Sequence, residues 1–115
     1  MIGVDIQKIA RIKKSLESDA FAERVFTAAE REYCDSRALP EQSYAGMFCA
    51  KEAAVKAVKQ GFCAISPRDV EVRHADDGSP RLVFYGNAAP FFAGCNVDVS
   101  ISHDGEYAIA AVQIL

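Results

Sequence analysis

A carboxylate and two lysines fall on one stripe of a predicted helix in the middle of the chain. Within Phe48–Ala57, Glu52 and Lys56 are one turn apart, and Lys59 joins their stripe when residues are placed 100° apart around a helix axis. Mg²⁺ takes oxygen ligands and often shares one or two protein carboxylates with a substrate phosphate. The stripe therefore indicates either a site for Mg²⁺ and a phosphate or an exposed Glu–Lys pair worth about 0.3 kcal/mol.

Two further polar side chains lie where predicted strands could carry them toward such a site. Asp5 interrupts the apolar strand Met1–Ile6, at a position where a hydrophobic residue would be more natural. It is a candidate second carboxylate for the same cation, and equally a candidate N-cap for the helix that follows. His103 ends a predicted strand, where it could contact a phosphate, relay a proton or pack in a turn against Tyr107.

Positive charge is concentrated on the first predicted helix, at Lys8, Arg11, Lys13 and Lys14. The whole chain, by contrast, has 13 basic and 16 acidic residues and a formal net charge of -3. That balance gives no general attraction to nucleic acid or to an anionic membrane, so we expect neither as a partner. The basic stretch is either a solvated helix face or a local patch for an acidic partner.

The cysteines and the hydropathy pattern bear on location and metal content. Four cysteines form no C-x-x-C pair, and only two histidines, His74 and His103, could complete a zinc site with them, so the spacings argue against structural zinc. Unpaired thiols are typical of a reducing compartment. No apolar run approaches the roughly 18 residues of a membrane span, and no signal-peptide pattern opens the chain. We therefore expect a cytoplasmic protein without structural zinc.

Helical patterns fill the first half of the chain. They predict helices over 7–16 and 20–25. Thr27 followed by Glu30 is a capping-box signature for a third helix, which should run to about Asp35. After a loop that contains Pro40, the alanine-rich segment 43–59 should form the longest helix and end before a C-cap at Gly61.

Strand patterns fill the second half. Segments 70–73 and 82–85 flank a Gly-Ser-Pro turn, and segments 97–102 and 107–115 flank a turn at 103–106, which predicts two hairpins. Together with the helices, they predict one α+β domain over 1–115, in which N-terminal helices pack on a small antiparallel sheet.

The last predicted strand is apolar on both faces. Because few helices are available, they can cover only one of these faces. Either a neighbouring subunit covers the other face, or the strand is central in a monomer. One face carries Ala108, Ala110, Val112 and Ile114, and the other carries Tyr107, Ile109 and Ala111.

The order of these motifs resembles that of the holo-acyl-carrier-protein synthases, the small-chain class of 4′-phosphopantetheinyl transferases. The resemblance covers essentially the whole chain. Its most specific parts are the early G-x-D at Gly3–Asp5 and the F-x-x-K-E-x-x-x-K-A segment at Phe48–Ala57. The other matching segments are Arg24–Thr27 with Glu30, Asp69–Val72 and Ser100–His103.

The resemblance implies an α+β homotrimer with an active site at each subunit interface. It implies transfer of phosphopantetheine from coenzyme A to a serine of an acyl carrier protein, with release of adenosine 3′,5′-bisphosphate. Asp5 and Glu52 would be the Mg²⁺ ligands, Lys56 would contact the coenzyme A diphosphate, and His103 would lie near the nucleotide. Glu52, a metal-bound water or a group of the carrier could take the serine proton. An acidic carrier would meet Lys8, Arg11 and Lys14.

Three departures from the family pattern stand beside this resemblance. Met47 occupies a position that is usually basic, and 60–63 replaces the usual G-T-G turn. Glu17, Asp19 and Ala20 occupy a stretch that is commonly basic in relatives. The first two departures, Met47 and the altered turn at 60–63, motivate an alternative function, a non-catalytic trimer that binds coenzyme A or a related nucleotide and acts as a scaffold.

Overall fold

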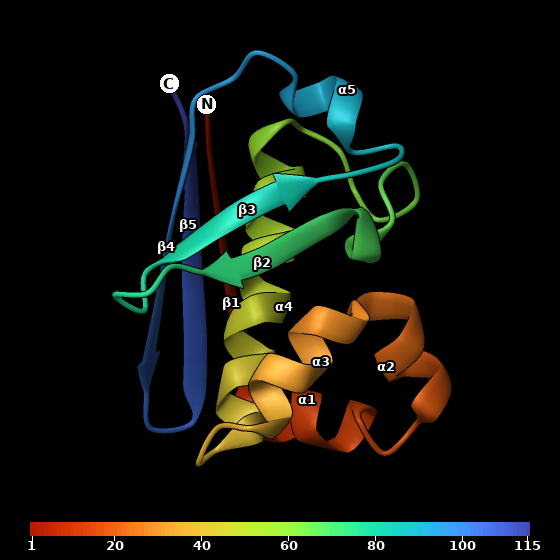
Figure 1. Ribbon diagram of the computed structural model, residues 1–115, viewed down its shortest axis with the longest axis vertical. Coiled ribbons are helices and arrows are strands. Elements are labelled where there is room, and N and C mark those ends of the chain that lie inside the picture. The colour runs from red at the N-terminus through yellow and green to blue at the C-terminus, as the bar shows by residue number, and fades with distance from the viewer.

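Helix α4 (Pro40–Ala57) is the axis around which the other elements pack in the computed structural model, which describes residues 1–115 (Figure 1). A three-stranded sheet runs along one side of α4, a two-stranded hairpin crosses beside it, and three short helices lie at its N-terminal end. The remaining elements are β1 (Ile2–Lys8), α1 (Ile9–Ser15), α2 (Asp19–Val25), α3 (Ala28–Asp35), a 3-10 turn (Pro67–Asp69), β2 (Val70–His74), β3 (Pro80–Phe84), α5 (Ala89–Phe92), β4 (Val97–Asp104) and β5 (Tyr107–Ile114).

The short helices follow the local signals in the sequence, with one shift. The capping box is present, because Thr27 Oγ1 accepts from the Glu30 N–H at 3.2 Å and Glu30 Oε1 accepts from the Thr27 N–H at 2.9 Å. The first helix starts at Ile9, two residues later than predicted, because strand pairing with β5 continues through Lys8. Lys8 therefore ends a strand and does not belong to the basic helix.

Both ends of α4 differ from the prediction. The helix starts at Pro40, whose missing N–H and fixed φ suit the first turn, so Pro40 is not in a loop. At the other end Lys59 adopts a φ of 60°. The Gln60 N–H then bonds to the Val55 carbonyl at 2.8 Å, as in a Schellman cap. Lys59, rather than Gly61, takes the left-handed position.

The buried side of α4 is made of small residues on which β1 lies directly. A Cβ on Gly3 would overlap the backbone oxygen of Ala53, so only glycine allows this approach. Side chains alternate along a strand, and Asp5 therefore points to the same side as Gly3. The alanines concerned, all at most 1% exposed, are Ala45, Ala50, Ala53, Ala54 and Ala57.

The main sheet has the antiparallel order β1-β5-β4 and packs one face on α4. On β5 that face is buried, from Ala108 to Ile114 at every second residue. The opposite face is open, since Tyr107 is 41% and Ile109 is 40% exposed. The alternative of a central strand buried on both sides within one chain is therefore wrong. β1 adds exposed Ile2, Val4 and Ile6 to this open face.

Both predicted hairpins are present, since β4 pairs with β5 and the segment after residue 70 forms the other hairpin. β2 pairs with β3 from Val70↔Phe84 to His74↔Pro80, and the turn between them contains Gly78. The fold is α+β, as predicted. None of the helices is both long enough and apolar enough to cross a membrane.

Candidate active site

Asp5 and Lys56 meet where β1 lies on α4. Asp5 is 8% exposed, and its Oδ1 accepts from Lys56 Nζ at 3.0 Å while its Oδ2 accepts from Gln7 Nε2 at 3.0 Å. Lys56 Nζ also donates to the Val4 carbonyl at 3.3 Å. The alternative of Asp5 as a helix N-cap is wrong, because β1 continues through Lys8, which is itself the N-cap residue of α1.

Glu52 lies one turn before Lys56 on α4 and is half-buried. Burial is the main cause that raises its pKa, and the negative charge of Asp5 raises it further, whereas Lys56 lowers it. The ion pairs of the chain join Lys56 to Asp5, Lys51 to Glu30 and Arg73 to Glu71, and none includes Glu52. The alternative of an exposed Glu52–Lys56 pair is therefore wrong, because the Lys56 ammonium pairs with Asp5 instead.

This donor set fits a divalent cation that is shared with a substrate. The repulsion between the Glu52 and Asp5 carboxylates would be relieved by a cation between them. No third His, Cys, Asp or Glu side chain joins them in a cluster, which matches the way Mg²⁺ binds through one or two carboxylates, phosphate and water. The Lys56 side chain is 49% exposed and can leave Asp5.

His103 lies elsewhere. Asp5 is on β1 and His103 is on β4, and β5 runs between them, so two strand spacings of roughly 5 Å each separate the two strands. His103 pairs in register with Ala108, whereas Tyr107 pairs with Asp104 and points to the opposite face. The alternative of His103 packing on Tyr107 is therefore wrong, and one chain alone does not bring His103 to the two carboxylates.

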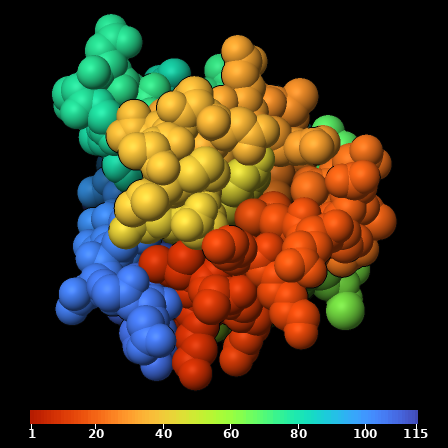
Figure 2. Space-filling model, turned by 90° about the horizontal axis from the view of Figure 1, so that it is seen from below, coloured from red at the N-terminus to blue at the C-terminus, as the bar shows by residue number.

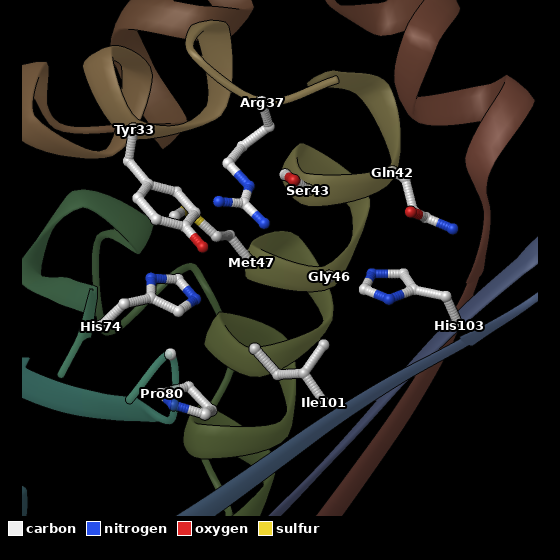
Figure 3. A pocket seen from close by; sticks show the side chains of 11 residues that line it. Tyr33, Arg37, Gln42, Ser43, Gly46, Met47, His74, Pro80, Ile101 and His103 are labelled. Atoms are coloured by element: carbon white, nitrogen blue, oxygen red, sulfur yellow. The ribbon is translucent and has the colours of Figure 1, made fainter. Parts of the chain in front are cut away.

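His103 lines a cavity of about 270 Å³ between α3, α4, the β2–β3 hairpin and β4 (Figure 3). In Figure 3 the Arg37 guanidinium points into this cavity and the His103 ring lies on its other side. Tyr33 and His74 stack with their ring centroids 4.0 Å apart, and Arg37 Cζ lies 5.3 Å from the Tyr33 centroid. Burial, followed by the charge of Arg37, lowers the pKa of His74.

The chemistry of this cavity suits an anionic ligand with a planar ring. A guanidinium and two imidazoles can donate hydrogen bonds to phosphate oxygens, and aromatic side chains can contact a base. Met47, an uncharged residue that lines the cavity, is 1% exposed and packs its Sδ 3.6 Å from Cys34 Sγ. Arg37 supplies a cation to the cavity that Met47 lines.

The sequence prediction missed Tyr33, Arg37 and His74. They come from α3, from the segment after it and from β2, and only tertiary packing brings them together. No local pattern marks them. The nearest available signal was Gly46, a glycine inside an alanine-rich helix, which also lines this cavity.

Lys8, Arg11 and Lys14 are all exposed. Figure 2 shows a face of the molecule to which the N-terminal residues, coloured red, contribute. In that view the red surface of the first residues lies between the blue β4–β5 end and the orange α2 region. A hollow beside α1 is lined by Lys13 together with Glu17 and Asp19, so positive and negative side chains adjoin on this surface.

Comparisons with known proteins agree on one family. Residues 1–112 match the model of the 4′-phosphopantetheinyl transferase superfamily. The chain is 44% identical over 108 residues to the holo-[acyl-carrier-protein] synthase of Finegoldia magna, which covers 94% of this chain and 89% of that protein.

Solved structures give the same result. The holo-[acyl-carrier-protein] synthase of Helicobacter pylori in complex with coenzyme A superimposes with a TM-score of 0.87 at 32% identity and covers 100% of both chains. The synthase of Bacillus anthracis in complex with CoA (3′,5′-ADP) gives a TM-score of 0.83 at 38% identity and covers 98% of this chain and 93% of that one.

Proposed function

The chain belongs to the 4′-phosphopantetheinyl transferase superfamily, and we propose that it transfers 4′-phosphopantetheine from coenzyme A to a serine of an apo acyl carrier protein. The products are holo carrier and adenosine 3′,5′-bisphosphate. The similar proteins named above are holo-[acyl-carrier-protein] synthases, and the two solved structures among them are described as complexes with CoA. The observation that carries the proposal is the meeting of Asp5 with Lys56, one turn from Glu52.

Each half of coenzyme A has a matching surface on this chain. Lys56 is the only partner of Asp5 that carries a positive charge, and its half-exposed ammonium would move to the diphosphate when substrate enters. The cavity between Arg37 and His103 would take the anionic nucleotide end. Positioning of the two ends would hold the β-phosphorus next to the incoming serine.

The proposed reaction is a displacement at that phosphorus. The serine oxygen forms a bond to the β-phosphorus, and the bond from this phosphorus to the bridging oxygen breaks. The bridging oxygen and the electron pair leave with adenosine 3′,5′-bisphosphate, and the serine proton passes to a base. Asp5 and Glu52 would hold Mg²⁺, which when bound supplies positive charge to the phosphate oxygens. Lys56 adds a second positive charge on the leaving side.

We infer that the site is completed between subunits of a homotrimer, each a single domain over 1–115. Two observations support this: Asp5 and His103 lie on opposite edge strands of one sheet, and the open sheet face presents apolar side chains. One protomer would give Asp5, Glu52 and Lys56, and its neighbour would give His103 and Arg37. The free thiols are consistent with a cytoplasmic location.

A transfer assay tests the proposed function directly. The protein is incubated with coenzyme A, Mg²⁺ and an apo acyl carrier protein, and the carrier is then weighed by mass spectrometry. A gain of one phosphopantetheine group that requires Mg²⁺ supports the enzyme. If nucleotide binds but no carrier gains mass across several carriers, the chain is a binding scaffold and the proposal is wrong.

Mixing two inactive variants tests the composite site. Glu52→Gln and His103→Ala damage different halves, so a hybrid trimer contains some interfaces in which both halves are intact. We expect activity to return after the two variants are unfolded and refolded together, and not when each is refolded alone. No recovery in verified hybrids would place both halves in one protomer.

A further inference from the structure

We propose that Gly46 is a positioning residue for His103, because the absence of a side chain on Gly46 lets the imidazole lie directly on helix α4. This inference rests on the proposed function, in which His103 contacts the nucleotide. It goes beyond that function by assigning a role to a residue that has no reactive group of its own.

The evidence is the space around Gly46. A Cβ added there would lie 2.8 Å from Nε2 and 3.3 Å from Cε1 of His103, and 2.8 Å from Cγ2 of Ile101. These separations are shorter than van der Waals contact, so an alanine requires the neighbours to move. Figure 3 shows the His103 ring and Ile101 on the side of α4 where Gly46 lies, and all three line the cavity.

Helix stability alone favours alanine at this position. Glycine inside a helix loses more conformational freedom on folding than alanine does. Most of the other small residues on the buried side of α4 are alanines, including Ala45 before Gly46 and Ala50 one turn after it. Gly46 therefore stands at a position where alanine would favour the helix but its methyl group would meet the His103 imidazole, which the proposed site uses.

Gly3 shows why the consequence at Gly46 should be functional rather than structural. A side chain on Gly3 would meet the backbone of Ala53, which cannot move without separating β1 from α4. At Gly46 the neighbours are the ends of two side chains from β4, and His103 is exposed and able to turn. An alanine at 46 should therefore displace the imidazole and leave the fold intact.

Proton NMR reports the displacement without reference to activity. The chain has two histidines, so the imidazole Cε1–H signals come only from His74 and His103, and a His74→Gln sample assigns them. We expect Gly46→Ala to shift the His103 signals and to leave those of His74 nearly in place. Gly61→Ala is the matched control, because nothing lies within 4 Å of a Cβ at that position. Unmoved His103 signals in Gly46→Ala overturn the proposal.

Kinetics then test whether the displacement matters through His103. We expect Gly46→Ala to raise KM for coenzyme A about tenfold with a smaller change in kcat, as for the loss of one hydrogen bond to a charged group. In a His103→Ala background, where transfer is lost, the dissociation constant for coenzyme A is measured by calorimetry, and the same substitution should leave it unchanged because the ring that the alanine displaces is absent. An undiminished loss of affinity in that background would assign the effect to Ile101 packing and overturn the proposal.

The outcomes separate this inference from the proposed function. If the wild-type protein transfers no phosphopantetheine, the proposed function fails, while the NMR comparison still decides whether Gly46 places the imidazole. If transfer occurs and Gly46→Ala retains wild-type KM and unmoved His103 signals, the proposed function stands and the positioning role is wrong.

Discussion

The Lys56 ammonium lies 3.0 Å from a carboxylate oxygen of Asp5, across 51 positions of the chain. The two partners differ in exposure, since Asp5 is 8% and the Lys56 side chain 49% exposed. Asp5 is therefore the fixed member and Lys56 the mobile one. Gly3 makes the pair possible, because it lets β1 lie on the backbone of α4 two residues before Asp5. The early G-x-D motif and the helical K-E-x-x-x-K motif therefore act together: the first lets β1 pack on α4, and the packing brings Asp5 to Lys56.

Glu52→Gln should separate stability from activity. The amide keeps the size of the side chain but removes the charge that Asp5 repels, so Tm without metal should rise. Transfer should fall about a hundredfold or more, because a proposed metal ligand is lost. Calorimetry and the carrier mass assay check the two effects. Glu32→Gln, on the exposed side of α3, is the control with the same chemical change. Normal turnover by Glu52→Gln would show that Glu52 is not a metal ligand.

His74 should make stability depend on pH. Its pKa is lowered in the folded protein, by burial and then by Arg37, so the unfolded chain binds more protons near the ordinary value of 6.5. The stability is therefore complete above that value and is lost as the pH falls through it toward the folded pKa. Urea unfolding at about pH 7.5 and about pH 5.5 measures the loss. The loss should shrink in His74→Gln, and an equal loss in both proteins would contradict the assignment.

The sequence was sufficient to predict the helices and strands whose signals lie within a few neighbouring residues. Thr27 and Glu30 start a helix through contacts between residues three apart, and the alternating strands after Val70 pair across short turns. Where the signals compete, the prediction fails. Pairing with β5 extends β1 through Lys8 into what reads as helix, and Lys59 takes a backbone conformation for which Gly61 was the natural candidate.

The site was predictable in part for the same reason. Asp5, Glu52 and Lys56 stand out as charged residues in apolar or helical surroundings, and their meeting follows once β1 packs on α4. The cavity does not follow from any local pattern, because Arg37 and His74 reach it from segments far apart in the sequence. The sequence also cannot show that Asp5 and His103 lie on opposite edges of a sheet, since this depends on β5 inserting between β1 and β4.

Charge reversal on α1 should weaken binding of the carrier without affecting binding of coenzyme A. Arg11→Glu places an acid on the exposed surface that an acidic carrier would approach, so KM for the carrier should rise about tenfold. The effect should shrink as salt rises from about 50 mM to about 300 mM, because the interaction is screened. Lys13→Glu changes the same charge on the same helix but faces the hollow with Glu17 and Asp19, and should have a weaker effect. Equal effects of the two variants would argue against a specific docking face.

A charge on the open sheet face should prevent assembly. Ile109 is 40% exposed, is the third residue of β5 and lies opposite exposed Ile6 of β1, with exposed Val4 nearby. In a trimer this face would be buried, and Ile109→Glu would bury an unpaired carboxylate there. Sedimentation should show trimers for the wild type and monomers for the variant, with transfer lost in the monomer. Ile109→Val should still assemble. A wild-type protein that is monomeric at micromolar concentration would contradict the composite site.

Lys51 and Glu30 form an ion pair in which both side chains are fully buried, and its loss should have the largest effect on stability. Lys51 Nζ donates to Glu30 Oε1 at 2.8 Å and to the carbonyls of Pro67 and Val70 at 2.9 and 2.7 Å. Glu30 Oε2 accepts from the Val72 N–H at 2.7 Å. Burial lowers the pKa of Lys51, and Glu30 opposes that shift. Lys51→Met leaves the carboxylate unpaired and should cost about 3–5 kcal/mol of unfolding free energy.

The position of this pair gives the loss a functional consequence. It joins α3, α4 and the start of β2, and these are the elements that carry Tyr33, Glu52 and His74. Arg73→Met is the control, because it breaks a pair whose basic side chain is 48% exposed and should cost less. Urea denaturation compares the two variants. If Lys51→Met costs no more than Arg73→Met, the buried pair is not what holds these three elements together.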